Sequence, residues 1–253
     1  GILNLTPNSF SDGGKFNTVD KALKQALKLE EDGADFIDVG GESTGPKSEY
    51  VSLEEELNRV IPVLKALRKK TKLPISIDTY KSEVAKQAFE YGANIINDVT
   101  ALRGDKSMAR LAAKLNCPII LMHSKDSTAR TTVQKKKYKN VIKTIDSFFR
   151  KRIRYAEKQG IKRKNIIIDP GMGQFISAIP KYSFEIIARL QELKKFKLPI
   201  LIGISRKSCI GGPMETREEK GKVLEAIAFL NGANIIRTHN VKNTKEFIEN
   251  LMN

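Results

Sequence analysis

The sequence predicts an α/β fold, a (β/α)8 barrel of the TIM type. Short β-branched runs that end in polar residues alternate with apolar positions at helical spacing, and this alternation occurs eight times. The 253 residues contain no linker or change in composition that would divide them, and barrels of this size commonly form one domain. An open, doubly wound sheet is the alternative fold.

The eight expected strands share a short apolar run that ends in polar residues or glycine. They lie at Ile2–Asn4, Ala34–Val39, Pro74–Asp78, Ala93–Asp98, Pro118–His123, Asn165–Asp169, Pro199–Gly203 and Ala233–Arg237. A Gly-Ala pair introduces three of them, at Gly33, Gly92 and Gly232. This pair is typical of a glycine that ends a helix before a tight turn into a strand.

Apolar residues at helical spacing fill the segments between these strands, most clearly over residues 19–27, 53–64 and 141–153. Ser52 and Glu55 form a capping box that predicts the start of the second helix. Pro62 lies inside the same helix and predicts a kink or shift there.

The formal net charge is +16, and residues 103–164 alone carry +15 of it. A nucleic-acid or membrane-surface patch is one explanation. A solvated helix face is the favoured one, because Phe148 and Phe149 fall on an apolar stripe rather than among the charges. We therefore expect neither nucleic acid nor membrane as a partner. Cys117 and Cys209 lie in apolar contexts without metal-binding spacing, which predicts free thiols and a cytoplasmic location.

Polar residues follow the expected strands where a barrel carries its active site, at the C-terminal ends of the strands. They are Asn4, Asp38, Asp78, Asn97, Asp98, His123, Asp169, Lys207, Arg237 and His239. Acidic and basic side chains together around this end of the barrel, called the mouth below, indicate an enzyme. For Asp98 and His123, a local hydrogen-bonding role in a loop is an equal alternative.

The types of these residues indicate the ligand. Asp78, Asn97 and Asp169 offer acceptors to a heteroaromatic edge with an amino group and a ring N–H. Lys207, Arg237 and His239 follow the last two strands, where such barrels usually bind phosphate. The pattern predicts a nitrogen heterocycle that carries a phosphate or pyrophosphate. Residues 6–14, rich in turn formers, are expected to form a mobile lid.

Eight motifs occur in one order along the chain, from Gly1 to about residue 240. They are GILNLTP with SFSDGG, DVGGEST, SIDT, INDV, LMH, IDPG, SRKS and IRTH. In this order they resemble the dihydropteroate synthases, folate-pathway enzymes that join 6-hydroxymethyl-7,8-dihydropterin pyrophosphate to p-aminobenzoate. The resemblance implies a Mg²⁺-dependent transferase, a sulfonamide target and a homodimer. It also implies one barrel domain over residues 1–253, with room for a fused upstream pterin pyrophosphokinase in a longer polypeptide.

The resemblance also implies roles for individual residues. The pterin would be held by Asp78, Asn97, Met122, Asp169, Lys207 and Arg237. The pyrophosphate would be held by Asn4, Thr44, Arg237 and His239, with Asn4 also binding Mg²⁺. The p-aminobenzoate would be bordered by Phe10, Thr44, Pro46, Ser205 and Lys207. Phe10 and Asp12 would arrive as the first loop closes, and the catalytic set would be Asp12, Lys207, Arg237 and His239. An SN1-like reaction would follow, with positive charge spread over the pterin ring.

Three departures from the family pattern accompany the matches. Gly45 stands where the family usually has arginine, Asn8 stands where it usually has aspartate, and residues 172–177 replace a segment that usually contains lysine. The Gly45 departure supports one alternative, a catalytically impaired pterin-binding domain. A pterin-binding methyltransferase on the same barrel is the other, although it has less use for Lys207, Arg237 and His239.

Overall fold

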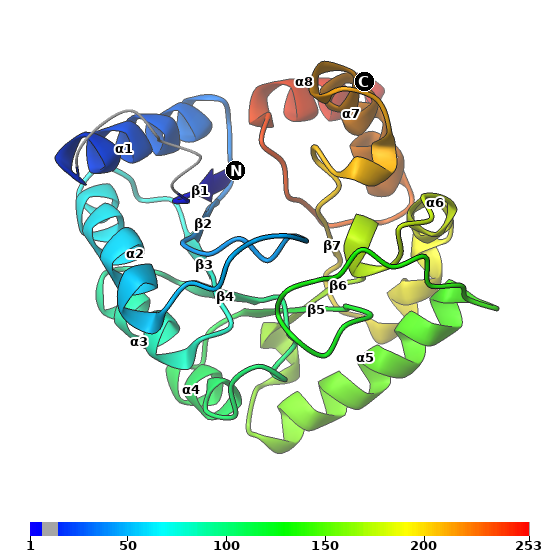
Figure 1. Ribbon diagram of the computed structural model, residues 1–253, viewed down its shortest axis with the longest axis horizontal. Coiled ribbons are helices and arrows are strands. Elements are labelled where there is room, and N and C mark those ends of the chain that lie inside the picture. Colours follow the sequence, from blue (N-terminus) through cyan, green and yellow to red (C-terminus); the bar gives the residue numbers. More distant parts are fainter. Residues whose placement is uncertain (7–14, 253) are drawn as a thin grey trace.

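The computed structural model describes residues 1–6 and 15–252, in which eight strands alternate with eight α-helices around one ring (Figure 1). The strands are β1 (Ile2–Asn4), β2 (Ile37–Gly40), β3 (Ile75–Asp78), β4 (Ile95–Asp98), β5 (Ile119–Met122), β6 (Ile166–Asp169), β7 (Leu201–Ile202) and β8 (Ile235–Ile236). The helices are α1 (Lys15–Glu31), α2 (Leu53–Arg68), α3 (Ser82–Glu90), α4 (Met108–Leu115), α5 (Val141–Lys158), α6 (Lys181–Ala188), α7 (Met214–Leu230) and α8 (Val241–Met252).

The strands close into a barrel. β1 to β6 form one parallel sheet in chain order, and β7 pairs with β8. A bridge between Ile168 and Ile200 joins β6 to the β7 side, and the Ile2 N–H donates to the Thr238 carbonyl at 3.0 Å, which joins the β8 side to β1. The (β/α)8 barrel is therefore confirmed, and the alternative of an open sheet is wrong.

The strands that follow Gly-Ala pairs begin later than the sequence predicts. Gly33, Gly92 and Gly232 have φ angles of +90°, +97° and +104°, which confirms the predicted glycine turns. The alanine after each glycine still donates its N–H to the preceding helix, at 2.9 Å, in the pairs Ala34 to Leu29, Ala93 to Ala88 and Ala233 to Ala228. Because this alanine completes the helix end, the strand begins two or three residues after it.

Helix α2 begins as predicted but only half of the capping box forms. The Ser52 hydroxyl accepts the Glu55 N–H at 3.1 Å, whereas the Glu55 carboxylate pairs with Arg59 at 2.9 Å. A pair four residues apart on an exposed helix face competes with the reciprocal cap. The helix continues through Pro62 rather than ending there.

The core lies between the sheet and the surrounding helices. Phe149 on α5 is fully buried, and its ring lies 5.6 Å from Phe148 and 6.0 Å from Phe196. Lys151 and Arg154 on the same helix are exposed. The aromatic stripe of this basic region therefore belongs to the core, as the sequence predicts. Within the described residues, no helix is both long and apolar enough to cross a membrane.

Replacing Phe149 with alanine should lower the free energy of unfolding by about 3–5 kcal/mol, because a large buried ring leaves a cavity. Urea unfolding followed by circular dichroism measures the loss. The matched control is Phe184→Ala on α6, whose residue is 39% exposed and should lose much less. Equal losses in the two variants would contradict this account of the core.

Candidate active site

Polar side chains from separate strands meet at the C-terminal rim of the barrel. Asp78 ends β3 and lies in register with Gly40 of β2 and Asn97 of β4. Asp169 ends β6, and Arg237 directly follows β8. Parallel strands place these positions at one edge, so residues distant in sequence surround one opening.

Arg237 lies at the centre of this group. Its Nε donates to the Asp38 carboxylate at 2.6 Å and its Nη2 donates to the Asp78 carboxylate at 2.8 Å. The Asn97 amide lies 3.3 Å from both oxygens of Asp38, which is 1% exposed. One guanidinium thus links β8 to β2 and β3, and Asn97 extends the network to β4.

Burial shifts the pKa values of these groups. It raises the pKa of Asp78 to about 7, although the positive charge of Arg237 opposes the rise. Burial alone would lower the pKa of Arg237, but Asp38 and Asp78 outweigh this effect and raise it. Burial also raises the pKa of Asp169 and lowers that of Lys207, and each of these two groups opposes the shift of the other. The mouth therefore holds several groups poised to change protonation when a ligand binds.

An apolar platform lies beside these charges. Met122 at the end of β5 packs with Val99 and Ala129, and Tyr80 and Phe175 pack against this cluster. The ammonium of Lys207 lies 5.0 Å from the centre of the Phe175 ring and 3.3 Å from the Met172 carbonyl oxygen, to which it donates. A flat apolar surface next to acceptors and a cation suits a planar heterocycle with polar edges.

His239 and Ser205 form a short hydrogen-bond chain on the other side of the mouth. The His239 N–H donates to Ser205 Oγ at 3.2 Å, and Ser205 Oγ lies 3.0 Å from His239 Nδ1. Burial, and to a smaller extent the positive charges of Arg206 and Arg237, lowers the pKa of His239 to about 3. The imidazole is therefore neutral near pH 7. In the tautomer whose Nδ1 accepts from the Ser205 hydroxyl, the ring proton lies on Nε2, which can then donate to an anion.

The comparisons with known proteins decide the family. The family described as "Pterin binding enzyme" matches residues 1–239. The chain belongs to the pterin binding enzyme family. The dihydropteroate synthase of Clostridium beijerinckii is 45% identical over 246 residues, which cover 95% of this chain and 88% of that protein. This match places the chain among the dihydropteroate synthases and confirms the predicted resemblance and enzyme class.

Two solved structures share the fold of this pterin binding enzyme. A dihydropteroate synthase from Clostridium difficile, crystallised in the presence of pteroic acid, has a TM-score of 0.91 and 40% identity, covering 98% of this chain and 93% of that one. The Xanthomonas albilineans dihydropteroate synthase with 4-aminobenzoic acid has a TM-score of 0.92 and 38% identity, covering 100% of this chain and 90% of that one.

The remaining expected site residues within the described part of the chain lie at the end of β1 and in the loop after β2. Asn4 is exposed at the end of β1. Thr44 and Pro46 are half-buried in the loop after β2. Phe10 and Asp12, together with Asn8 and most of the expected lid, lie outside the described residues. The loop after β2 and the end of β1 therefore border the mouth from one side.

The possible metal ligands at the mouth suit Mg²⁺ better than a metal ion that is coordinated by protein side chains alone. Among the described residues, no three His, Cys, Asp or Glu side chains are grouped to hold a metal ion. Mg²⁺ usually takes one or two protein oxygens and completes its shell with water and substrate phosphates. The Asn4 amide oxygen, exposed at the end of β1, meets this requirement.

Asp98 and His123 brace loops rather than face the mouth. Asp98 accepts the N–H groups of Thr100 at 2.8 Å and Leu102 at 2.7 Å. His123 Nδ1 lies 3.2 Å from the Pro170 carbonyl oxygen, and burial lowers its pKa to about 3. Gly171 beside it has a φ of +72°, and a Cβ there would lie 2.2 Å from the His123 carbonyl oxygen. The local alternative for both residues is supported.

Sequence reasoning placed Asp38 at the rim without assigning it a contact, and it did not single out Arg130. Asp38 is the partner of both Arg237 and Asn97. Its position in an apolar strand beside Asp78 is the signal that could have identified it. Arg130 lies in the loop after β5 and pairs with Glu42, a contact between residues 88 apart in the chain. No local pattern indicates such a pair.

Replacing Arg237 with glutamine should raise the pKa of Asp78 above its value of about 7, because the change removes the cation that stabilises the carboxylate. Titration of the carboxyl carbons by ¹³C NMR measures the shift. Arg206→Gln is the control, since Arg206 pairs with Glu218 outside this network. An Asp78 pKa that is the same in Arg237→Gln and in the unchanged protein would show that the ion pair does not form in solution.

Proposed function

We propose that the chain condenses 6-hydroxymethyl-7,8-dihydropterin pyrophosphate with p-aminobenzoate to give 7,8-dihydropteroate and pyrophosphate, in the cytoplasm. The observation that carries the proposal is the group of Asp38, Asp78, Asn97 and Arg237 beside the Met122 platform, in a member of this family. Acceptors for a heterocycle lie there next to a cation suited to a phosphate.

The pterin lies on the platform with its polar edge toward the rim. Asp78 and Asp169 accept from the amino group and ring N–H of the pterin, and Asn97 supplies a further amide contact. Met122 packs against the ring, and Lys207 donates to a ring acceptor from beside Phe175. These groups are held by strand ends and hydrogen bonds before the ligand arrives, which lowers the cost of binding.

The pyrophosphate leaves toward the cationic side of the mouth. The bond between the pterin methylene carbon and the pyrophosphate oxygen breaks, the electron pair goes to the pyrophosphate, and the ring delocalises the positive charge. Arg237 uses two of its five N–H groups on Asp38 and Asp78, so others remain for the phosphates. His239 donates through Nε2, and Thr44 lies in the loop beside them. When bound to Asn4, Mg²⁺ neutralises charge on the leaving group.

The p-aminobenzoate enters from the side of the loop after β2. Its amine nitrogen forms a bond to the methylene carbon and then loses a proton to solvent. Thr44 and Pro46 border this substrate from one side, and Ser205 and Lys207 border it from the other. The family resemblance also assigns Phe10 and Asp12 to this reaction, and both lie outside the described residues.

Mixing the protein with both substrates and Mg²⁺ should release pyrophosphate, and a chelator should suppress the release. The Asp78→Asn and Asp169→Asn variants should each bind the pterin about ten- to a hundredfold more weakly, because each change removes a charge-assisted hydrogen bond worth roughly 1.5–3 kcal/mol. Calorimetry measures the affinity, and Asp146→Asn on α5 is the control. Unchanged affinity in both variants would show that the pterin lies elsewhere.

Gly45 favours a second candidate, a pterin-binding domain with impaired turnover. A Cβ at position 45 would meet only Ser43 Oγ, at 3.5 Å, so the first carbon of a side chain fits there in ordinary contact. Pterin binding without pyrophosphate release in the unchanged protein, together with release in Gly45→Arg, would establish this candidate. Release by the unchanged protein would exclude it.

We also propose that two copies pair through α7. Val223, Ile227 and Leu230 form an apolar stripe on this helix and are 42%, 39% and 61% exposed. Gly221, Glu225 and Ala228, on the opposite side of the helix, are buried. A helix with apolar residues on both sides is typical of one that is covered by a partner.

Leu230→Glu should convert the dimer to a monomer, because it places a charge inside the shared apolar face. Light scattering during size-exclusion chromatography measures the mass. Leu53→Glu on α2, where the residue is 39% exposed, is the control and should remain a dimer. A Leu230→Glu protein that stays dimeric would place the interface on another face.

A further inference from the structure

We propose that Arg130 is a positioning residue that holds the loop after β2, residues 41–51, in the shape that receives p-aminobenzoate. This inference rests on the proposed function, because it concerns the second substrate of that reaction. Arg130 lies in the loop after β5, residues 123–140, and its side chain forms hydrogen bonds and an ion pair with Glu42, Ser48 and Glu49 of the distant β2 loop.

Arg130 bridges the two limbs of the β2 loop. On the entering limb its Nη2 pairs with the Glu42 carboxylate. On the leaving limb its Nε donates to the Ser48 carbonyl at 3.2 Å and its Nη2 donates to the Glu49 carbonyl at 2.8 Å. The turn between the limbs contains Thr44 and Pro46, two of the residues assigned to the p-aminobenzoate. One guanidinium therefore sets how far apart the limbs stand.

The residue next to Arg130 holds the tip of the same turn. The Thr131 N–H donates to the Thr44 carbonyl at 3.1 Å. Within the turn, the Ser48 hydroxyl donates to the Gly45 carbonyl at 2.7 Å, and Lys47 has a φ of +71°. Because Gly45 has no side chain to reach toward a substrate, the backbone placement of Thr44 and Pro46 decides what this loop contributes.

The β5 loop is firm enough to act as an anchor. Asp126 accepts the Lys125 ammonium at 2.5 Å and the Thr132 N–H at 2.9 Å. The Thr131 hydroxyl lies 2.9 Å from the Gln174 carbonyl oxygen, and the Lys125 N–H donates to the Phe175 carbonyl at 2.8 Å. These contacts tie the β5 loop to the segment after β6. The position of the β2 loop is thus set relative to the Phe175 side of the pterin platform.

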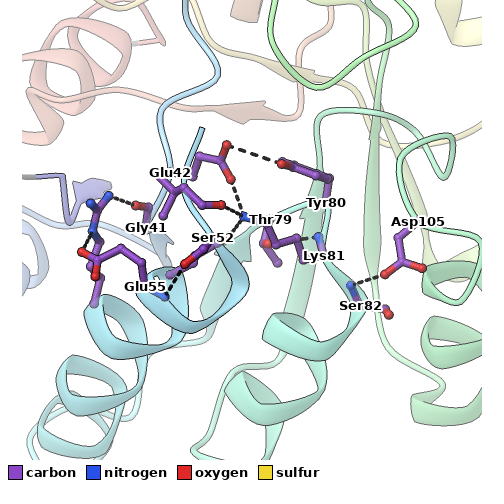
Figure 2. A network of polar contacts seen from close by, with 12 residues as sticks. Gly41, Glu42, Ser52, Glu55, Thr79, Tyr80, Lys81, Ser82 and Asp105 are labelled. Atoms are coloured by element: carbon purple, nitrogen blue, oxygen red, sulfur yellow. Dashed lines mark hydrogen bonds and ion pairs between the residues drawn. The ribbon is translucent and has the colours of Figure 1, made fainter. Parts of the chain in front are cut away.

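Glu42 is fixed independently of Arg130. Lys81 lies 2.5 Å from Glu42 and 2.5 Å from Glu56, and the Tyr80 hydroxyl lies 3.4 Å from Glu42 (Figure 2). Lys81 also donates to the Val51 carbonyl at 2.8 Å. Loss of Arg130 leaves Glu42 with a buried cationic partner, so the barrel should still fold. The leaving limb at Ser48 and Glu49, by contrast, loses two hydrogen bonds.

An arginine is required by this geometry. Its planar guanidinium offers several N–H groups in a fixed fork, so one side chain serves a carboxylate and two carbonyls at the same time. A lysine ammonium is a single point of charge on a flexible stem. In Arg130→Lys it can pair with Glu42, and we expect it to hold the two carbonyls of the leaving limb less well, because its three N–H groups all extend from one nitrogen. The lysine variant therefore distinguishes the effect of the positive charge at position 130 from the effect of hydrogen bonds to both limbs of the β2 loop.

The test compares Arg130→Ala and Arg130→Lys with the unchanged protein. Arg130→Ala should raise the KM for p-aminobenzoate about tenfold, equivalent to about 1.4 kcal/mol, and Arg130→Lys should raise it less. The kcat and the calorimetric affinity for the pterin should stay within about twofold of the original values. Arg150→Ala is the control, since Arg150 is exposed on α5 and pairs only with Asp146 among the described ion pairs.

Amide hydrogen exchange gives a second readout that does not need turnover. Residues 43–50 should exchange faster in Arg130→Ala, while β3 and β4 should not change. An unchanged KM, or an equal loss of affinity for both substrates, would overturn the inference. If the unchanged protein released no pyrophosphate, the proposed function would fail, and the exchange rates alone would decide whether Arg130 holds the loop. Unchanged exchange at residues 43–50 would show that it does not.

Discussion

The ion pairs of Arg237 with Asp38 and Asp78 are the constraint on which the site depends. Parallel strands bring the carboxylates of β2 and β3 to the same rim, where two negative charges repel each other and lose hydration. Their shared cation, Arg237, comes from the last strand end of the barrel, after β8. Closing the ring and assembling the site are therefore one event. A chain that failed to seat β8 against β1 would leave buried carboxylates without a partner.

The same arrangement explains how the mouth can hold so much charge and still bind a flat ring. The Met122 platform supplies apolar contact area, and the charged groups are confined to its edge. Their orientation is fixed by strands and by neighbours such as Asn97, so little reorganisation is needed as charge develops on a leaving group. Neutral His239 belongs to this pattern, because Ser205 occupies one ring nitrogen and leaves the other for a ligand.

Much of this was predictable, because it depends on local pattern. Strand and helix periodicity gave the barrel, the Gly-Ala pairs gave the turns, and the polar strand ends gave most of the rim. The rest depends on tertiary contacts. The neutrality of His239 follows from burial, which no spacing reveals. The late strand starts follow from alanines that complete helix ends. The pairing of Arg130 with Glu42 joins two loops, and the composition of neither loop indicates the other.

Because of that pairing, the loops after β2 and β5 should be transplanted together when sequences of homologous enzymes are combined. A loop on a barrel rim is usually regarded as a module that can be transplanted from a homologue without disturbing its neighbours. Here the acceptor groups lie in one loop and the donor that organises them lies in the other. Grafting either loop alone from a homologue that lacks one of these two residues would leave Glu42 or Arg130 without this contact. In chimeras of such enzymes, both loops should therefore come from the same parent sequence.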